Sequence, residues 1–356
     1  MTIPVQNLYY LLSYAWDKLE EAEALNLDIS DYEEAVNLFG RVLIASCNHI
    51  IKRGLDRAYI STQEDYSGVK GKINFNDTIN KQLFNQGKVN CIFDEFTTNV
   101  IHNKVLKSTL RLLANLDNVD KKIKEDAWKC FHRFQDVDQV ELKLSDFKQI
   151  HLHQNNAYYE LPLNVARFLI ENIVFDESEG KMKFKDFFRE DKAMAALFEE
   201  FTRNFYAREQ STYRVRREDI KWQVVPLFDS DLSLLPKMQT DITLESLEHK
   251  LIIDAKYYSK TVSDYYGSEK LHSTNLYQLN AYLSNLERDN SNPLNSDCDG
   301  MLLYPMVDRD IDVTYQIGSH KMRVATIDLA QNWDKIHTNL LGFLSDYRIS
   351  SSLVHI

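Results

Sequence analysis

The chain of 356 residues lacks the features that mark secreted, zinc-binding and membrane-spanning proteins. Its four cysteines lie far apart and form no Cys-x-x-Cys pair, which argues against a disulfide framework and against a cysteine zinc site. No apolar run reaches the ~20 residues of a membrane helix, and no signal-peptide pattern begins the chain. Gly68 and Gly71 are not followed by the Lys-Ser/Thr of a P-loop and predict a tight turn. We therefore expect a cytoplasmic protein without a membrane partner.

Positive charge is also scarce, because 42 Lys and Arg residues face 53 Asp and Glu residues, giving a formal net charge of −11. Proteins that bind DNA unaided are usually basic, since phosphate neutralisation supplies most non-specific affinity. An acidic chain acting on DNA needs either a small basic groove, for which Arg214, Arg216 and Arg217 are candidates, or another subunit that delivers the DNA. The acidic balance favours the second arrangement, although an acidic surface also serves solubility.

The length and the 44% hydrophobic fraction predict two folded domains. In the first half, Asn7 is expected to cap a helix beginning at Leu8, helical patterns cover 35–52 and 99–116, and strand-like patterns cover 59–76 and 89–96. The second half predicts helices at 191–209, 275–286 and 333–347, and strands at 213–225, 238–244, 251–256, 300–304 and 322–329. We predict an α+β domain at 1–160 and an α/β domain at 161–356 with helices flanking its sheet.

An acid and a base follow the most apolar of these predicted strands. Residues 251–253 read Leu-Ile-Ile, as in a strand buried on both faces, and the run ends on Asp254-Ala255-Lys256. Side chains alternate across a strand, so Asp254 and Lys256 point to the same face. Charge at the end of a buried strand is costly unless it is paired or bound to a metal.

A second carboxylate is expected at the same place. Asp241 lies within the strand-like run 238–244, which a polar link at 245–250 separates from the run ending on Lys256. If the two runs pair as a hairpin, Asp241 lies across from Asp254. Two carboxylates suit Mg²⁺ or Mn²⁺, and the lysine can orient water and offset charge on a phosphoryl group. The residues alone leave two readings open, a metal-dependent phosphodiesterase site and a structural ion pair.

The order Pro236, Asp241, Asp254-x-Lys256 resembles the core of the PD-(D/E)xK nucleases. The Gln278-x-x-x-Tyr282 pattern on a predicted helix also matches that superfamily. The resemblance implies a restriction-endonuclease-like domain with a mixed sheet flanked by helices.

The same resemblance implies roles for individual residues. Asp241 and Asp254 would bind the metal, Lys256 would be the catalytic lysine, and Gln278 would be an accessory catalytic contact to metal water or backbone. Glu199, in a Phe-Glu-x-Phe context on the helix before the core, would add a metal contact. The alternative for Glu199 is an ordinary glutamate on an exposed helix face.

Over nearly its full length the chain resembles the McrC family, the nuclease subunits of McrBC modification-dependent restriction systems. The residues that carry this resemblance, in chain order, are Ile3-Pro4-Val5, Asn7-Leu8-Tyr9-Tyr10, Tyr14-Ala15-Trp16, Gly68-Val69-Lys70-Gly71-Lys72-Ile73, Phe93-Asp94, Asn99, Asn103, Leu106-Lys107-Ser108-Thr109-Leu110, Leu234-Leu235-Pro236, Thr240-Asp241-Ile242, Asp254-Ala255-Lys256-Tyr257-Tyr258 and Asn275-Leu276-Tyr277-Gln278-Leu279.

Membership of that family implies a magnesium-dependent DNA endonuclease, with Mn²⁺ as a possible substitute. Residues 1–160 would dock on a hexameric AAA+ GTPase partner, McrB, and stimulate its GTP hydrolysis. The partner would recognise and deliver double-stranded DNA that contains a modified cytosine. The alternatives are a non-catalytic activator or scaffold of the GTPase, and a nuclease that acts on RNA.

Overall fold

The chain folds into two compact units whose bounds differ from the predicted ones. The computed structural model describes residues 3–29, 32, 34–176, 181–184, 191–227, 231–258, 263–265, 268–270 and 272–350. One unit comprises Glu20–Lys185, and the other comprises Met1–Leu19 together with Asp186–Ile356. The predicted division into 1–160 and 161–356 places the first helix with the first half of the chain, whereas it belongs to the unit that contains Asp186–Ile356. It also places residues 161–185 with the second half, whereas they belong to the unit Glu20–Lys185.

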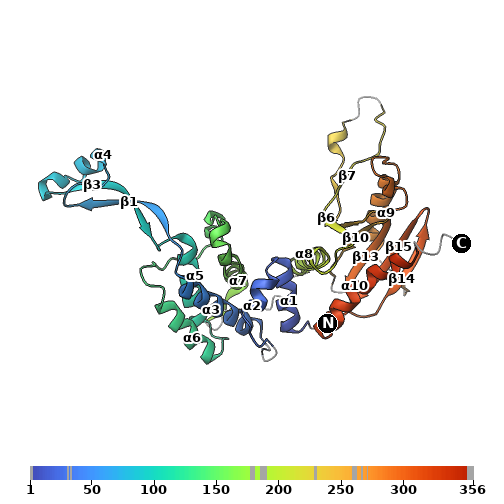
Figure 1. Ribbon diagram of the computed structural model, residues 1–356, viewed down its shortest axis with the longest axis horizontal. Coiled ribbons are helices and arrows are strands. Elements are labelled where there is room, and N and C mark those ends of the chain that lie inside the picture. Colours follow the sequence, from blue (N-terminus) through green and yellow to red (C-terminus); the bar gives the residue numbers. More distant parts are fainter. Residues whose placement is uncertain are drawn as a thin grey trace. The chain divides into compact units, whose positions relative to one another are not determined.

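The unit formed by Glu20–Lys185 consists of a helical body and a projecting arm (Figure 1). Its α-helices are α2 (Leu19–Ala24), α3 (Ala35–Arg53), α4 (Phe75–Asn80), α5 (Ile101–Asn115), α6 (Lys121–His132) and α7 (Glu160–Glu171), with 3-10 turns η1 (Leu83–Gln86), η2 (Asp146–Gln149) and η3 (Gln154–Tyr159). Gly40 allows close helix packing, because a Cβ there would lie 3.1 Å from the side chains of Leu113 and Ile123. The helices predicted at 35–52 and 99–116 are confirmed.

The arm is a three-stranded antiparallel sheet in the order β1-β3-β2, formed by β1 (Ala58–Tyr66), β2 (Lys72–Ile73) and β3 (Val89–Thr97). Gly71 has φ +69°, and a Cβ there would lie 2.5 Å from the carbonyl oxygen of Ile92. The tight turn predicted for the glycine pair is wrong, because β1 and β2 run in the same direction on either side of β3 and residues 67–71 cross from one side of β3 to the other. Several large apolar side chains of the arm are exposed, namely Tyr59, Tyr66, Val69, Phe75, Ile79, Phe84 and Phe96.

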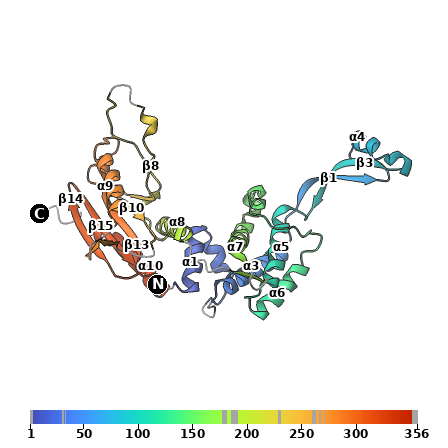
Figure 2. The same ribbon diagram turned by 180° about the vertical axis from the view of Figure 1, so that it is seen from behind.

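The other unit is built around a six-stranded mixed sheet (Figure 2). The strands follow the order β14 (Asp312–Ile317), β15 (His320–Ile327), β13 (Asp299–Pro305), β10 (Lys250–Ala255), β9 (Ile242–Glu245) and β6 (Arg214–Arg216). Strands β10, β13 and β15 are parallel, and the remaining neighbours are antiparallel. The mixed sheet implied by the sequence is therefore present.

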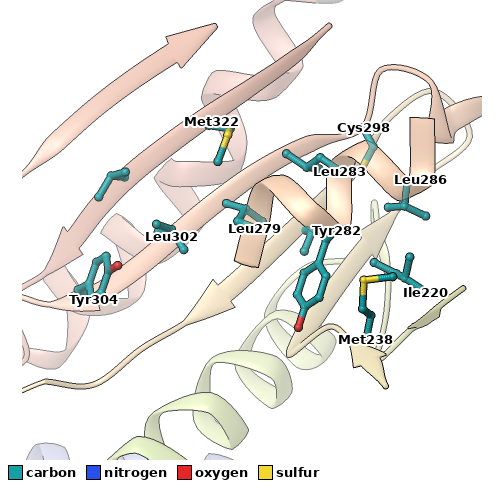
Figure 3. Packing of buried hydrophobic residues seen from close by; sticks show 12 residues of the cluster. Ile220, Met238, Leu279, Tyr282, Leu283, Leu286, Cys298, Leu302, Tyr304 and Met322 are labelled. Atoms are coloured by element: carbon teal, nitrogen blue, oxygen red, sulfur yellow. The ribbon is translucent and has the colours of Figure 1, made fainter. Parts of the chain in front are cut away.

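Helices cover both faces of this sheet. Helix α9 (Ser273–Glu287) packs its apolar side chains against β10, β13 and β15 (Figure 3). A Cβ at Gly300 would lie 2.9 Å from Leu283, so this glycine permits the close approach of α9. On the opposite face, Arg323 donates to the carbonyl oxygen of Phe343 in α10 (Trp333–Ser350) at 3.2 Å. Tyr206 of α8 (Asp191–Glu209) donates to Leu340 of α10 at 2.9 Å.

The first helix, α1 (Val5–Ala15), belongs to the sheet-containing unit. The expectation that Asn7 caps a helix from Leu8 is wrong, because the helix begins at Val5 and Asn7 lies inside it. The Asn7 amide instead donates to the carbonyl oxygens of Leu329 and Gln331, each at 2.8 Å. These contacts explain why the first residues pack with the second half of the chain.

Several strands differ from the prediction. The run predicted at 213–225 contains only β6 and β7 (Asp219–Ile220), and the run 238–244 divides into β8 (Met238–Gln239) and β9 around Thr240 and Asp241. The remaining strands and turns are β4 (Ile173–Asp176), β5 (Lys181–Phe184), β11 (Ser263–Tyr265), β12 (Ser268–Lys270), η5 (Leu232–Leu234) and η6 (Pro293–Asn295). Over the residues that the structure describes, no helix is both long and apolar enough to span a membrane.

Candidate active site

The hairpin of β9 and β10 brings the two predicted carboxylates together. The strands are antiparallel, and Ile242 pairs with Ile253, so Asp241 lies one residue before β9 and faces the Asp254 end of β10. Every residue of β10 is buried, as expected for a strand in the interior of a covered sheet. The sequence therefore places a carboxylate at the end of a buried strand and a second one beside it.

The lysine contacts both carboxylates. Lys256 Nζ lies 2.9 Å from Asp254 Oδ1 and 3.1 Å from Asp241 Oδ2. The backbone nitrogen of Ala255 also donates to Asp241 Oδ2, at 3.2 Å, which fixes this carboxylate against the end of β10. Asp241, Asp254 and Lys256 thus form one cluster, and the side chains of Asp254 and Lys256 share a face as the alternation predicts.

Burial makes the ionised form of Asp254 costly. Its side chain is fully buried, and its Oδ2 atom has no hydrogen-bond partner among the described residues. Burial raises the pKa of Asp254 to about 7, although the Lys256 ammonium lowers it, and the Asp241 carboxylate raises it further. Burial lowers the pKa of Lys256, but the Asp254 and Asp241 carboxylates outweigh this and leave that pKa above its ordinary value.

The donor set suits a small divalent cation. A buried carboxylate oxygen without a partner, next to a second carboxylate, supplies the hard oxygen ligands that Mg²⁺ and Mn²⁺ take. In the described part of the chain, no three His, Cys, Asp or Glu side chains are grouped to hold a metal. Protein ligation here would rest on Asp241 and Asp254, a number of carboxylates that is typical of Mg²⁺ sites.

Glu199 lies near the cluster but is engaged elsewhere. Its carboxylate forms an ion pair with Arg217 and lies 3.9 Å from Arg203 Nη1 of the same helix. Burial raises the pKa of Glu199, and the nearby Asp241 carboxylate raises it further, while Arg217 lowers it. Its role as a third metal ligand stays a prediction.

Gln278 acts on the site's backbone through a tyrosine. Its amide nitrogen donates to the hydroxyl of Tyr282 at 2.7 Å, and that hydroxyl donates to the carbonyl oxygen of Gln239 at 3.0 Å. Gln239 ends β8, two residues before Asp241. In Figure 3 the Tyr282 ring leaves helix α9 with its hydroxyl directed out of the apolar cluster. The pair therefore supports the segment that carries Asp241, and a direct contact of Gln278 to metal water stays a prediction.

Two of the three candidate basic-groove residues are neutralised by acidic partners. Arg216 lies 3.0 Å from Glu245 and 3.3 Å from Glu218, and Arg217 lies 2.8 Å from Glu200. The third candidate, Arg214 on edge strand β6, is exposed and forms no ion pair with another residue of the described part of the chain. These arginines therefore provide little free positive charge for a polyanion.

One polar bridge beside the site was not predicted from the sequence. Tyr258 donates to Asn275 at 3.2 Å, and Asn275 donates to Tyr304 at 3.0 Å. The Asn275-to-Gln278 run was recognised as part of a motif, but Tyr304 lies 29 residues further along the chain on β13. Only the parallel pairing of β10 with β13 brings the tyrosine to the site.

Comparison with known proteins identifies the family. A family model described as McrBC 5-methylcytosine restriction system component matches residues 5–305. A protein of Escherichia coli (strain K12), the Type IV methyl-directed restriction enzyme EcoKMcrBC, is 34% identical over 345 residues, which cover 97% of this chain and 98% of that protein.

A solved structure has a similar fold. It is the refined half-complex from a tetradecameric assembly of Thermococcus gammatolerans McrB AAA+ hexamers with bound McrC, with a TM-score of 0.56. The two chains are 14% identical, and the match covers 97% of this chain and 76% of that one, so this likeness concerns the fold alone. On the family match and the 34% identity, the chain belongs to the McrBC 5-methylcytosine restriction system component family.

Proposed function

We propose that this chain is the nuclease subunit of its restriction system and hydrolyses phosphodiester bonds of DNA at the Asp241–Asp254–Lys256 cluster. The observation that carries the proposal is the convergence of two carboxylates and one lysine at the end of a buried strand. The order of these residues and the mixed sheet support the assignment to the PD-(D/E)xK nucleases. The carboxylates would hold Mg²⁺, or Mn²⁺ in its place.

The cation, when bound, would supply Lewis-acid polarisation of the scissile phosphate. Asp241 and Asp254 would orient it, and ionisation of Asp254 becomes favourable once a positive charge replaces its proton. In the reaction, the oxygen of a water molecule bonds to phosphorus and gives up a proton to solvent, while the bond to the leaving oxygen breaks and that oxygen takes a proton from solvent. Although burial lowers the pKa of Lys256, the Asp254 and Asp241 carboxylates raise that pKa overall and favour its protonated form. Lys256 would donate to a phosphate oxygen and offset the charge that builds there.

We also propose that an AAA+ partner delivers the DNA. The net charge of −11 and the paired arginines leave this chain poorly equipped to bind a polyanion unaided. The related archaeal structure contains McrB AAA+ hexamers with bound McrC, which supports a hexameric, McrB-like GTPase as the partner here. The substrate would then be double-stranded DNA with a modified cytosine, in line with the 5-methylcytosine restriction family.

The arm of the Glu20–Lys185 unit is the surface that we assign to this partner. Exposed aromatic side chains are concentrated there, with Tyr59 74% exposed and Phe84 58% exposed. Exposed apolar patches of this kind mark protein interaction sites more often than free surface. The arm shares no residue with the Asp241–Asp254–Lys256 cluster, which belongs to the other unit.

The test is cleavage of 5-methylcytosine-containing plasmid by the chain, its co-purified GTPase, GTP and Mg²⁺. We expect Asp254→Ala to abolish cutting while the stimulation of GTP hydrolysis survives. Cutting by this variant at the wild-type rate would reject the proposed site. If neither wild type nor Asp254→Ala cuts the DNA and both still stimulate GTP hydrolysis, the chain is a non-catalytic activator. Parallel reactions with an RNA substrate test the remaining alternative, a nuclease that acts on RNA.

A further inference from the structure

Helix α9 holds both segments of the proposed site by side-chain bridges that start from one face of the helix. Gln278 and Tyr282 reach Gln239, which precedes Asp241. Asn275 lies three residues before Gln278 and therefore on the same side of the helix. It forms the second bridge, which reaches the segment after Lys256.

The second bridge ties the end of β10 to the neighbouring strand. Strand β10 ends at Ala255, and the backbone nitrogen of Lys256 still donates to the carbonyl oxygen of Leu303 at 2.9 Å. Two residues later Tyr258 donates to Asn275, which donates to Tyr304, the residue after Leu303. The three residues from Lys256 to Tyr258 are thus held to β13 at both ends.

Because the bridge is buried, its polar groups have few alternative hydrogen-bond partners. Asn275 is 4% exposed and Tyr304 is 1% exposed, and Tyr304 borders the apolar cluster of α9 and the sheet (Figure 3). A buried amide that loses its partners carries the full cost of desolvation, so alternative arrangements are disfavoured. Tyr258 also stacks on His272, the N-cap of α9, with ring centroids 4.6 Å apart. The orientation of Tyr258 is therefore fixed from two sides.

We propose that Asn275 is a positioning residue for the catalytic lysine, acting through Tyr258 and Tyr304. The inference rests on the proposed nuclease function. Lys256 must contact two carboxylates and a phosphate at once, and its backbone leaves the regular sheet at that position. Without the Asn275 bridge, the segment from Lys256 to Tyr258 keeps the backbone bond to Leu303, the contacts of Lys256 with the two carboxylates and the stacking of Tyr258 on His272, but it loses its side-chain link to Tyr304. The ammonium is then held less precisely at the phosphate.

The first test compares two identical substitutions on helix α9. Asn275→Leu removes the bridge, whereas Asn285→Leu removes bonds to the Gln223 backbone nitrogen, the Ala281 carbonyl oxygen and Met238 Sδ, none of which involves the segment from Lys256 to Tyr258. We measure single-turnover cleavage by the full complex over a range of DNA concentrations. Asn275→Leu should lower the maximal rate by about 10- to 100-fold, as loss of an orienting partner does, with an unchanged half-saturating DNA concentration. Asn285→Leu should cut at the wild-type rate.

The second test asks whether the effect passes through Tyr258. Tyr258→Phe breaks only the link to the lysine segment and keeps the ring on His272. We expect it to reproduce most of the Asn275→Leu effect, and the double variant should be no slower than Asn275→Leu alone. Because Tyr258→Phe removes one oxygen from a half-buried ring, it keeps the inference testable if Asn275→Leu fails to fold.

The outcomes separate this inference from the function on which it rests. Wild-type rates for both Asn275→Leu and Tyr258→Phe, in a complex that Asp254→Ala inactivates, would overturn the positioning role and leave the nuclease site standing. Equal slowing by Asn275→Leu and Asn285→Leu would show a merely structural role and would also overturn it. If Asp254→Ala cuts like wild type, the proposed site fails, and the positioning role fails with it.

Discussion

The two ends of strand β10 each carry a lysine beside two carboxylates, but the two clusters differ in charge. At the start of the strand, Lys250 lies 2.9 Å from Glu218 and 3.9 Å from Glu245. Arg216 contacts the same two glutamates, at 3.3 and 3.0 Å. Two cations therefore face two carboxylates, and Asn295 accepts a further bond from Lys250 at 2.7 Å.

At the other end, Lys256 is the one cationic residue in the described part of the chain that contacts Asp241 and Asp254, so these three groups in their ionised forms carry an excess negative charge. Glu218 also has a carboxylate oxygen without a hydrogen-bond partner among the described residues, so an unpaired oxygen does not by itself distinguish the clusters. The charge does. Asp254 relieves the excess negative charge by keeping its proton until the pH approaches its pKa of about 7. A divalent cation would replace that proton.

This comparison separates a structural ion cluster from a site that is prepared for a ligand. The Lys250 cluster is neutral, and its lysine is fully buried, so it is complete without a further ion. In the proposed function, the Lys256 cluster would be completed by a cation, and Lys256 remains 20% exposed, which would let a phosphate reach it. The sequence leaves both readings open for Asp254-x-Lys256, and the contrast with the surroundings of Lys250 favours the ligand-site reading.

The largest expected effect concerns catalysis. Asp254→Asn should slow DNA cleavage by about a thousandfold or more, since it removes a metal ligand and with it several kcal/mol of Lewis-acid stabilisation. The Lys250→Met variant, which is changed at the start of β10, should cleave DNA at the wild-type rate per folded molecule. Cleavage by the full complex at a temperature where both variants are folded measures this difference. Comparable losses of activity in both variants would erase the distinction between the clusters.

The opposite ranking is expected for stability. Lys250→Met leaves Glu218 and Glu245 with one cation between them and should lower the free energy of unfolding by about 3–5 kcal/mol, the usual cost of breaking a buried ion pair. Asp254→Asn should leave that free energy unchanged or raised, because a costly buried acid is removed. Urea titrations of the chain without divalent cations measure both values. A Lys250→Met protein as stable as wild type would contradict the structural role of this cluster.

Much of this comparison could not be predicted from the sequence. Asp241, Asp254 and Lys256 were predictable because an apolar run buries β10 and a short polar link makes a hairpin the simplest pairing. The polar composition of 245–250 predicts an exposed link, yet Lys250 begins β10 and is fully buried. Its partners Glu218 and Asn295 lie 32 and 45 residues away, so only the tertiary fold reveals them.

Edge elements were missed for a related reason. Strand β14 alternates apolar and polar residues, with Val313, Tyr315 and Ile317 on one side, but all of its side chains are exposed and no buried run marks it. The first helix was assigned to the wrong unit, because the side-chain bonds of Asn7 to the backbone near Leu329 span more than 300 residues. Local pattern predicts elements and not their distant partners.

A smaller effect is expected from cation binding. Saturating Mg²⁺ or Mn²⁺, at about 100 times its dissociation constant, should stabilise the wild-type chain by about 3 kcal/mol if the ion binds only the folded carboxylate pair, as we propose. Asp254→Asn should show no such gain, and Lys250→Met should show the full gain from its lower starting point. Thermal unfolding with and without the ion tests this. Equal stabilisation of wild type and Asp254→Asn would place the cation elsewhere.

The smallest effect is a pH dependence of stability in the absence of divalent cations. The folded pKa of Asp254 is raised to about 7, whereas the unfolded carboxyl ionises near its ordinary value. The folded state therefore holds a proton that the unfolded state has lost, and stability falls as pH rises toward 7 and then levels off. Relative to Asp254→Asn, wild type should lose on the order of 2 kcal/mol between pH 5 and pH 7. A difference that is independent of pH, or that grows in the opposite direction, would contradict the raised pKa.

The most direct measurement is an anomalous diffraction map from crystals of the chain soaked in Mn²⁺. We expect one strong peak within about 2–2.5 Å of carboxylate oxygens from both Asp241 and Asp254, with Lys256 close by and no peak at the Lys250 cluster. No peak at Asp241 and Asp254 under saturating Mn²⁺, or a peak at Glu218 and Glu245 instead, would contradict the assignment of the cutting site.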